Sequence, residues 1–170
     1  MMLTTINPYT EEILAEYPFQ AAAHIDDCLT ASQGAFQRWR FFPAQQRAQY
    51  LAQIAKALRE ESVELARLVS VEMGKPLQEA KAEIEKCAQA SDYYAEHGLV
   101  LIAGFEKLQN FGQAFARVEA KGPILLIMPW NFPFWQVFRF AVPTLMAGNA
   151  ALLKHAPIST GAALAIEEIF

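Results

Sequence analysis

Apolar side chains recur every three or four positions over much of the first hundred residues, the spacing that gives an amphipathic helix one apolar face. A first helix is predicted over about residues 22–39. A second is predicted from Pro43, whose ring fits the first turn of a helix, to a break near residues 60–62. A third is predicted over residues 63–73, where Gly74 and the proline two residues later are typical of a helix end.

A further helical stripe covers residues 77–97 and is predicted to end at Gly98. Ahead of the helices, residues 3–7 and 12–17 are predicted to be extended, with turn-forming residues between them. The first hundred residues are therefore predicted to be mainly helical. Residues 107–121 mix polar and apolar side chains with little helical period, and we predict a hairpin or a pair of extended segments there.

The pattern changes towards the end of the chain. Residues 124–128 form a continuous apolar run, typical of a buried parallel strand. An amphipathic helix is predicted over residues 133–147, with a kink or a change of segment at Pro143. A second apolar strand is predicted over residues 150–154, and another helix over residues 158–170. Strand, helix and strand in succession make a right-handed βαβ unit, so the predicted fold class is α/β, with a helical layer leading into a parallel βαβ unit.

Composition and charge exclude several classes of protein. The chain is 54% hydrophobic and 19% charged, which is enough apolar material for a core, and its net charge is −4. No basic patch interleaved with aromatic residues is present, so a nucleic-acid partner is not expected. No apolar run approaches the ~18–20 residues needed to span a bilayer, so no membrane partner is expected either. Cys28 and Cys87 offer neither a disulfide framework nor metal-ligand spacing, which favours the cytoplasm and no bound metal.

The topology points to one ligand site. In an open parallel sheet, ligands bind beyond the carboxyl ends of the strands. This rule selects residues 128–133, after the first apolar strand, and residues 154–157, after the second. Neither segment carries a glycine-rich dinucleotide loop or a P-loop, so topology alone does not identify the ligand.

Five short motifs occur in one colinear series: MGKPL at residues 73–77, AKGP at 120–123, PWNFP at 129–133, PTLMAGN at 143–149 and LLK at 152–154. Together they resemble the aldehyde dehydrogenase superfamily, and the resemblance covers essentially the whole chain. The surroundings of Trp130, Gln136 and Val137, with KHAP at 154–157, resemble its bacterial succinate-semialdehyde dehydrogenase branch.

The resemblance implies oxidation of succinate semialdehyde to succinate with NAD or NADP, through a cysteine thiohemiacetal and thioester. By match, Asn131 is implied to be the side-chain half of the oxyanion hole. An amide N–H suits this role because it stabilises negative charge developing on oxygen without being titratable. The structural alternative for Asn131 is a turn residue before Phe132 and Pro133.

Lys154 matches the lysine that holds the adenosine ribose, where an ammonium can donate to ribose hydroxyls or to a 2′-phosphate. The alternative is a solvated lysine at a strand end. The family often has an acidic residue three positions after this lysine, and here Pro157 stands there. Without that carboxylate nothing repels a 2′-phosphate, so NADP should be tolerated. The implied cofactor-binding residues are Met128, Trp130, Asn131, Lys154, His155, Ala156 and Pro157.

Arg139 is the candidate for binding the substrate, with Trp135 one helical turn before it. Arg139 stands among apolar residues, and a buried guanidinium needs a partner. It matches the position at which semialdehyde dehydrogenases clamp the distal carboxylate of the substrate, an interaction suited to bidentate hydrogen bonding. The alternative is a structural ion pair with a glutamate.

The family's cysteine nucleophile and activating glutamate have no match in the chain and are expected beyond Phe170, so the chain by itself is expected to be inactive. Cys28 and Cys87 are expected to be buried structural cysteines without a paired histidine. Exposed apolar surface is expected, and with it a homo-oligomer.

The chain is expected to divide into three parts. Residues 1–104 would be the mainly helical part of the cofactor-binding domain, 105–122 a hairpin for oligomerisation, and 123–170 the βαβ part. Two alternatives stay open. One is another substrate, such as glutarate semialdehyde, and the other is a non-catalytic nucleotide-binding or interaction module.

Overall fold

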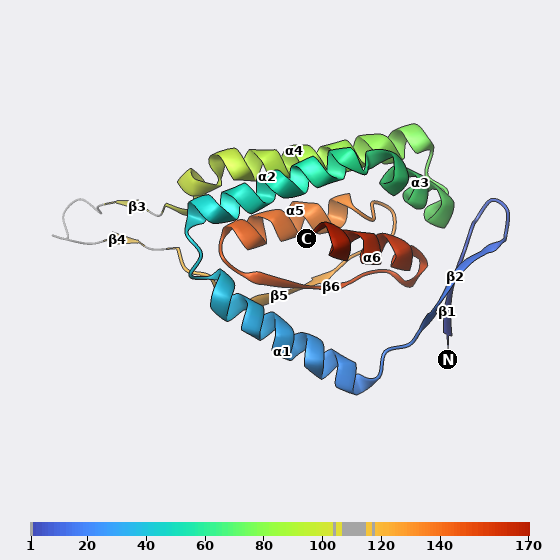
Figure 1. Ribbon diagram of the computed structural model, residues 1–170, viewed down its shortest axis with the longest axis horizontal. Coiled ribbons are helices and arrows are strands. Elements are labelled where there is room, and N and C mark those ends of the chain that lie inside the picture. The colour runs from blue at the N-terminus through green and yellow to red at the C-terminus, as the bar shows by residue number, and fades with distance from the viewer. Residues whose placement is uncertain (1, 104, 107–114, 117) are drawn as a thin grey trace.

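The chain begins with a β-hairpin that stands to one side of the helices (Figure 1). The computed structural model describes residues 2–103, 105–106, 115–116 and 118–170. Strands β1 (Met2–Ile6) and β2 (Ile13–Pro18) pair antiparallel, as the two predicted extended segments require. In the turn between them, the side-chain oxygen of Asn7 accepts a hydrogen bond from the backbone N–H of Tyr9 at 2.9 Å.

Three helices follow where the apolar spacing predicts them: α1 (Ala22–Trp39), α2 (Ala44–Glu60) and α3 (Ser62–Met73). The predicted break between the second and the third is confirmed. Gly74 ends α3 with φ 75°, in the left-handed region that glycine occupies without steric penalty.

Helix α4 (Leu77–Ile102) is longer than predicted, because Gly98 lies inside it and does not end it. A methyl group added at Gly98 would lie 2.5 Å from Cγ of Met146, so this glycine serves the close approach of another helix. The prediction that the helix ends at Gly98 is therefore wrong. The sequence signal of a glycine is the same whether it ends a helix or packs against one.

The last part of the chain is the predicted βαβ unit. Strands β5 (Pro123–Ile127) and β6 (Ala150–Lys154) pair in parallel, joined by α5 (Trp135–Met146). A 3₁₀ turn (Pro157–Ser159) leads into α6 (Thr160–Ile169), in place of the single helix predicted there.

Two details of this unit differ from the predictions. Helix α5 passes through Pro143 as one element, so of the kink or change of segment predicted there, the change of segment does not occur. Strand β5 is not buried on both faces, because Leu125 is 60% exposed and Ile127 is 68% exposed. Helix α1 packs mainly on β6, so the side chains of Leu125 and Ile127 on β5 stay exposed.

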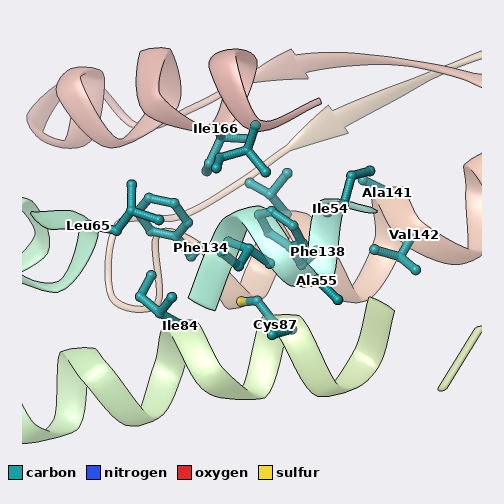
Figure 2. Close-up of a cluster of buried hydrophobic side chains, with 14 of the residues drawn as sticks. Ile54, Ala55, Leu65, Ile84, Cys87, Phe134, Phe138, Ala141, Val142 and Ile166 are labelled. Carbon is teal, nitrogen blue, oxygen red and sulfur yellow. The ribbon is translucent and has the colours of Figure 1, made fainter. Parts of the chain in front are cut away.

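The elements form layers around one apolar core. Helix α1 packs on one face of the two-stranded parallel sheet, mainly on β6, and α5 packs on the other. Helix α6 lies on the same side of the sheet as α5, and α2 and α4 lie beyond α5 (Figure 1). The core lies between these layers, where Phe134, directly before α5, and Phe138 of α5 stack with ring centroids 6.3 Å apart. Cys87 of α4 lies among these side chains (Figure 2). Buried residues of α2, α3 and α6 also belong to the cluster, among them Ile54, Ala55, Leu65 and Ile166.

Between α4 and β5, two short strands pair antiparallel, β3 (Phe105–Glu106) and β4 (Phe115–Ala116). Strand β4 lies in the segment predicted to be extended, residues 107–121, whereas β3 lies just before it. Residues 107–114 and 117 of that segment lie outside the described residues. In the described part of the chain, no helix has the length and apolar character needed to cross a membrane.

Candidate functional site

The carboxyl ends of β5 and β6 lie side by side, as the topology predicts. Ile127 is in register with Lys154, and the pairing continues one residue further because the N–H of Met128 donates to the carbonyl oxygen of Lys154 at 3.1 Å. The two segments selected by the strand-end rule, residues 128–133 and 154–157, therefore begin at adjacent points on one edge of the sheet.

His155 joins these two segments. Its Nε2 lies 2.9 Å from the carbonyl oxygen of Pro133, and its Nδ1 accepts from the N–H of Ala156 at 2.8 Å. The two contacts together define the tautomer: Nδ1 must be the acceptor, so Nε2 carries the proton and donates it. His155 thus ties the segment after β6 to the turn before α5, a role that the sequence does not reveal.

The side chains at this edge differ in their access to a ligand. Met128 is 9% exposed and belongs to the core, whereas Trp130 is 48% exposed. Asn131 and Lys154 are both exposed. The amide and the ammonium that the resemblance singles out are therefore accessible from solvent on the two adjacent segments.

A buried glutamate holds the start of α5. Oε1 of Glu83, in α4, accepts from the backbone N–H groups of Phe134 and Trp135 at 2.9 and 3.0 Å. Its other oxygen pairs with Nζ of Lys75, which lies 3.9 Å from the ring centroid of Phe132. The side chains of Lys75 and Glu83 are only 5% and 1% exposed.

Sequence reasoning missed this pair. A signal was available, because Glu83 is a charged residue directly beside Ile84 on the apolar stripe of its helix. An ionised group at a buried position is costly unless it is paired with an opposite charge. A glutamate at this position therefore predicts a buried cation beside it.

The other end of α5 is also held by side chains. Nε of Arg47 donates to the carbonyl oxygen of Met146 at 3.0 Å, and the indole N–H of Trp39 donates to that of Leu145 at 2.8 Å. Burial lowers the pKa of Arg47 from its usual value. The carbonyl oxygen of Leu145 also accepts from the N–H of Gly148 at 2.9 Å. Carbonyl groups in the last turn of a helix lack partners within the helix, so the side chains of Trp39 and Arg47 add donors there and tie this end of α5 to α1 and α2.

Arg139 is exposed, and the expectation of a buried guanidinium is wrong. Its guanidinium carbon lies 5.0 Å from the ring centroid of Phe140, the next residue in α5. Trp135 does lie one turn earlier, and Nζ of Lys86 lies 4.1 Å from the centroid of its ring. The outer face of α5 is open here because no described element packs over Arg139, which leaves the guanidinium accessible.

The two cysteines differ. Cys87 is fully buried, and burial raises the pKa of its thiol far above the usual value, so it remains a protonated thiol in the core. Sγ of Cys28 lies 3.5 Å from Nε2 of His24, one helical turn earlier. The expectation that neither cysteine has a histidine partner is therefore wrong for Cys28, and the four-residue spacing was the signal for it.

Comparison with known proteins agrees with these features. The sequence profile of the aldehyde dehydrogenase family matches residues 1–170. The chain belongs to the aldehyde dehydrogenase family. Among curated relatives, the succinate semialdehyde dehydrogenase [NAD(P)+] Sad of Escherichia coli (strain K12) is 44% identical over 166 residues, which cover 98% of this chain and 36% of the relative. A probable succinate-semialdehyde dehydrogenase [NADP(+)] of Synechocystis sp. is 42% identical and matches 100% of this chain and 37% of its own length.

Solved structures share the fold. The succinic semialdehyde dehydrogenase of Streptococcus pyogenes in complex with NADP+ superposes with a TM-score of 0.94 at 32% identity, covering 98% of this chain and 37% of that one. The protein Gox0499 superposes with a TM-score of 0.96, also at 32% identity, covering 99% and 37%. The chain thus spans between a third and two fifths of the length of these relatives.

Proposed function

We propose that this chain is the N-terminal part of an NAD(P)-dependent aldehyde dehydrogenase that oxidises succinate semialdehyde to succinate. The observation that carries the proposal is a set of curated relatives, 37–44% identical along this chain, that are named succinate semialdehyde dehydrogenases. The geometry supports it, because an exposed amide and an exposed ammonium lie on adjacent segments at the carboxyl edge of the sheet.

The residues at this edge fit a dinucleotide. The exposed ammonium of Lys154 is free of the core and can donate to ribose hydroxyls or to a 2′-phosphate. The exposed ring of Pro157 carries no charge that would repel that phosphate. Together with Met128, Trp130 and Asn131, and with His155 and Ala156, these residues would hold the cofactor, which supplies the hydride acceptor of the reaction. NADP fits this set at least as well as NAD.

Asn131 would contribute to catalysis through its side-chain amide. When a thiolate attacks an aldehyde carbon, negative charge develops on oxygen, and a positioned N–H donor stabilises it. Removal of such a donor lowers kcat by about 10²–10³. The thiolate and the glutamate that activates water are proposed to belong to the part of the relatives that this chain does not cover.

Arg139 is proposed to bind the distal carboxylate of the substrate, with Trp135 beside it. An exposed guanidinium on the outer face of α5 has the five N–H donors that a carboxylate can accept in a bidentate pair. Hydrogen bonds to charged groups contribute about 1.5–3 kcal/mol. Loss of this pair should therefore raise KM by about 10- to 100-fold for a semialdehyde acid.

The test compares substrates in the full-length protein. Arg139→Ala should raise KM for succinate semialdehyde by that factor and leave KM for butanal within about twofold. Arg67→Ala is the matched control, because Arg67 is an exposed arginine on α3. Equal effects of Arg139→Ala on both aldehydes would exclude the carboxylate clamp. The wild-type enzyme should have a higher kcat/KM for succinate semialdehyde than for glutarate semialdehyde. The opposite order would favour glutarate semialdehyde as the substrate.

The first experiment on the whole proposal is to sequence the gene beyond the codon for Phe170. The expected result is a continuing frame that encodes a cysteine nucleophile and a glutamate base. An immediate stop codon would leave a chain without a nucleophile and would exclude the dehydrogenase function.

The domain division and the oligomer belong to the same proposal. We assign residues 1–104 and 123–170 to the cofactor-binding domain and residues 105–122 to contacts between subunits. Beside β6 lie two cavities of about 450 and 750 Å³, which share Ala151, Leu145 and Phe170 in their lining. We expect the rest of the full-length protein to fill these cavities. The oligomer is tested separately: light scattering of the full-length protein should give a mass of at least two subunits.

A further inference from the structure

We propose that the buried pair of Lys75 and Glu83 is a positioning device that holds the Asn131 turn in the geometry needed to stabilise the oxyanion. This inference rests on the proposed dehydrogenase function and deepens it. It assigns two residues of the helical layer to the chemistry at the edge of the sheet.

Glu83 holds the start of α5 through two hydrogen bonds. A single carboxylate oxygen accepts from the N–H groups of Phe134 and Trp135, three and four residues after Asn131. A carboxylate is favoured at a helix N-terminus, because the helix dipole and the unpaired N–H groups there both attract negative charge. Glu83 therefore attaches the residues that follow Asn131 to helix α4.

Lys75 contacts both Glu83 and the Asn131 turn. Its ammonium pairs with the other oxygen of Glu83 and lies over the ring of Phe132, the residue directly after Asn131. The attraction between a cation and an aromatic ring is larger where the cation is shielded from water, as it is here. The pair thus holds the turn at two places, the ring at position 132 and the backbone at positions 134 and 135.

A second buried glutamate in the chain, Glu72, caps a helix without a cation beside it among the described residues. Its Oε1 and Oε2 accept from the N–H groups of Gly161 and Ala162, at 2.7 and 2.9 Å, at the start of α6. The described residues show no cation paired with Glu72, so a buried carboxylate alone is sufficient to cap a helix here. What Lys75 adds to Glu83 is the contact with Phe132, and that contact acts on the turn rather than on the helix.

A buried ion pair gives little net stability compared with apolar residues of the same volume. Its presence beside the turn is better explained by placement of the turn. Displacement of a catalytic group by about 1 Å lowers the rate by about 10², so a device that prevents such displacement has a large effect on kcat.

The experiment uses the full-length enzyme with Glu83→Gln, which keeps an acceptor oxygen but removes the charge opposite Lys75. The expected result is a 10- to 100-fold fall in kcat, with KM for NADP+ within about twofold. The matched control is Glu72→Gln, the same change at the cap of α6, which should leave kcat within about twofold whatever it does to the unfolding midpoint.

A double-mutant cycle with Asn131→Ala tests whether Glu83 acts through Asn131. If it does, Glu83→Gln lowers kcat in the wild-type background but changes it by less than about twofold once the amide of Asn131 is gone. An equal loss in both backgrounds, or no loss in the wild type, would overturn the proposal. A general loss of folding produces that equal loss, so the cycle separates the two roles.

A milder variant covers the case in which Glu83→Gln fails to fold. Phe132→Leu leaves the ion pair intact and removes only the ring contact, and its smaller loss of kcat should also vanish in the Asn131→Ala background. If the wild type oxidises other aldehydes but not succinate semialdehyde, the substrate assignment fails, and the same cycle is run with the accepted aldehyde. If it oxidises no aldehyde, both proposals fail together.

Discussion

Two helical glycines in this chain should respond in opposite ways to the same substitution. In the interior of a helix, alanine is favoured over glycine by about 0.8–1.0 kcal/mol. A methyl group at Gly34, in α1, would lie 3.7 Å from the guanidinium of Arg38, an ordinary contact. Gly34→Ala should therefore raise the free energy of unfolding by about 0.5–1 kcal/mol.

At Gly98 the same methyl group meets the buried side chain of Met146. It would lie 2.5 Å from Cγ and 2.9 Å from both Sδ and Cε, in a side chain that is only 1% exposed. Overpacking of this kind costs about 1–3 kcal/mol, which exceeds the gain in helix propensity. We expect Gly98→Ala to lower the free energy of unfolding by about 1 kcal/mol, so the two variants should differ by about 2 kcal/mol.

Urea denaturation followed by tryptophan fluorescence measures both variants against the wild type, since the chain has 3 tryptophans. Combining Gly98→Ala with Met146→Ala gives a second test, because the new methyl group would occupy part of the space that Met146 vacates. The two changes should together cost less than the sum of their separate effects. A Gly98→Ala variant as stable as Gly34→Ala would refute the steric argument and the explanation of why α4 continues past this glycine.

Two further predictions concern charge. Pro157→Glu in the full-length enzyme should lower kcat/KM with NADP+ by at least about tenfold relative to NAD+, because a carboxylate would repel the 2′-phosphate, while Pro157→Ala should leave the ratio unchanged. Burial raises the pKa of Glu72 above 4.5, so the folded chain binds more protons than the unfolded chain just above that pH. Its contribution to stability is thus present below pH 4.5 and is lost as the pH rises through the raised pKa. The difference in unfolding free energy between the wild type and Glu72→Gln should fall over that interval, and a flat difference would contradict the shift.

The elements of this fold follow from local sequence, because apolar spacing and turn chemistry act within a few residues. Strand β6 and helix α1 have the predicted bounds for this reason. The errors occur where a distant part of the chain decides the outcome. Gly98 ends no helix because Met146 packs on it, and Arg139 is exposed because no described element covers its face of α5.

In the candidate site, too, some residues can be predicted from local sequence and others cannot. The strand-end rule places Asn131 and Lys154 on adjacent segments, because the carboxyl ends of neighbouring parallel strands share one edge. No local rule connects Glu83 with Phe134, since the two residues are 51 positions apart and meet only when α4 packs on α5. The residues that carry chemistry in such a site are therefore visible in the sequence, whereas those that hold them in place become visible only through the packing. The cycle between Glu83 and Asn131 measures the strength of that connection.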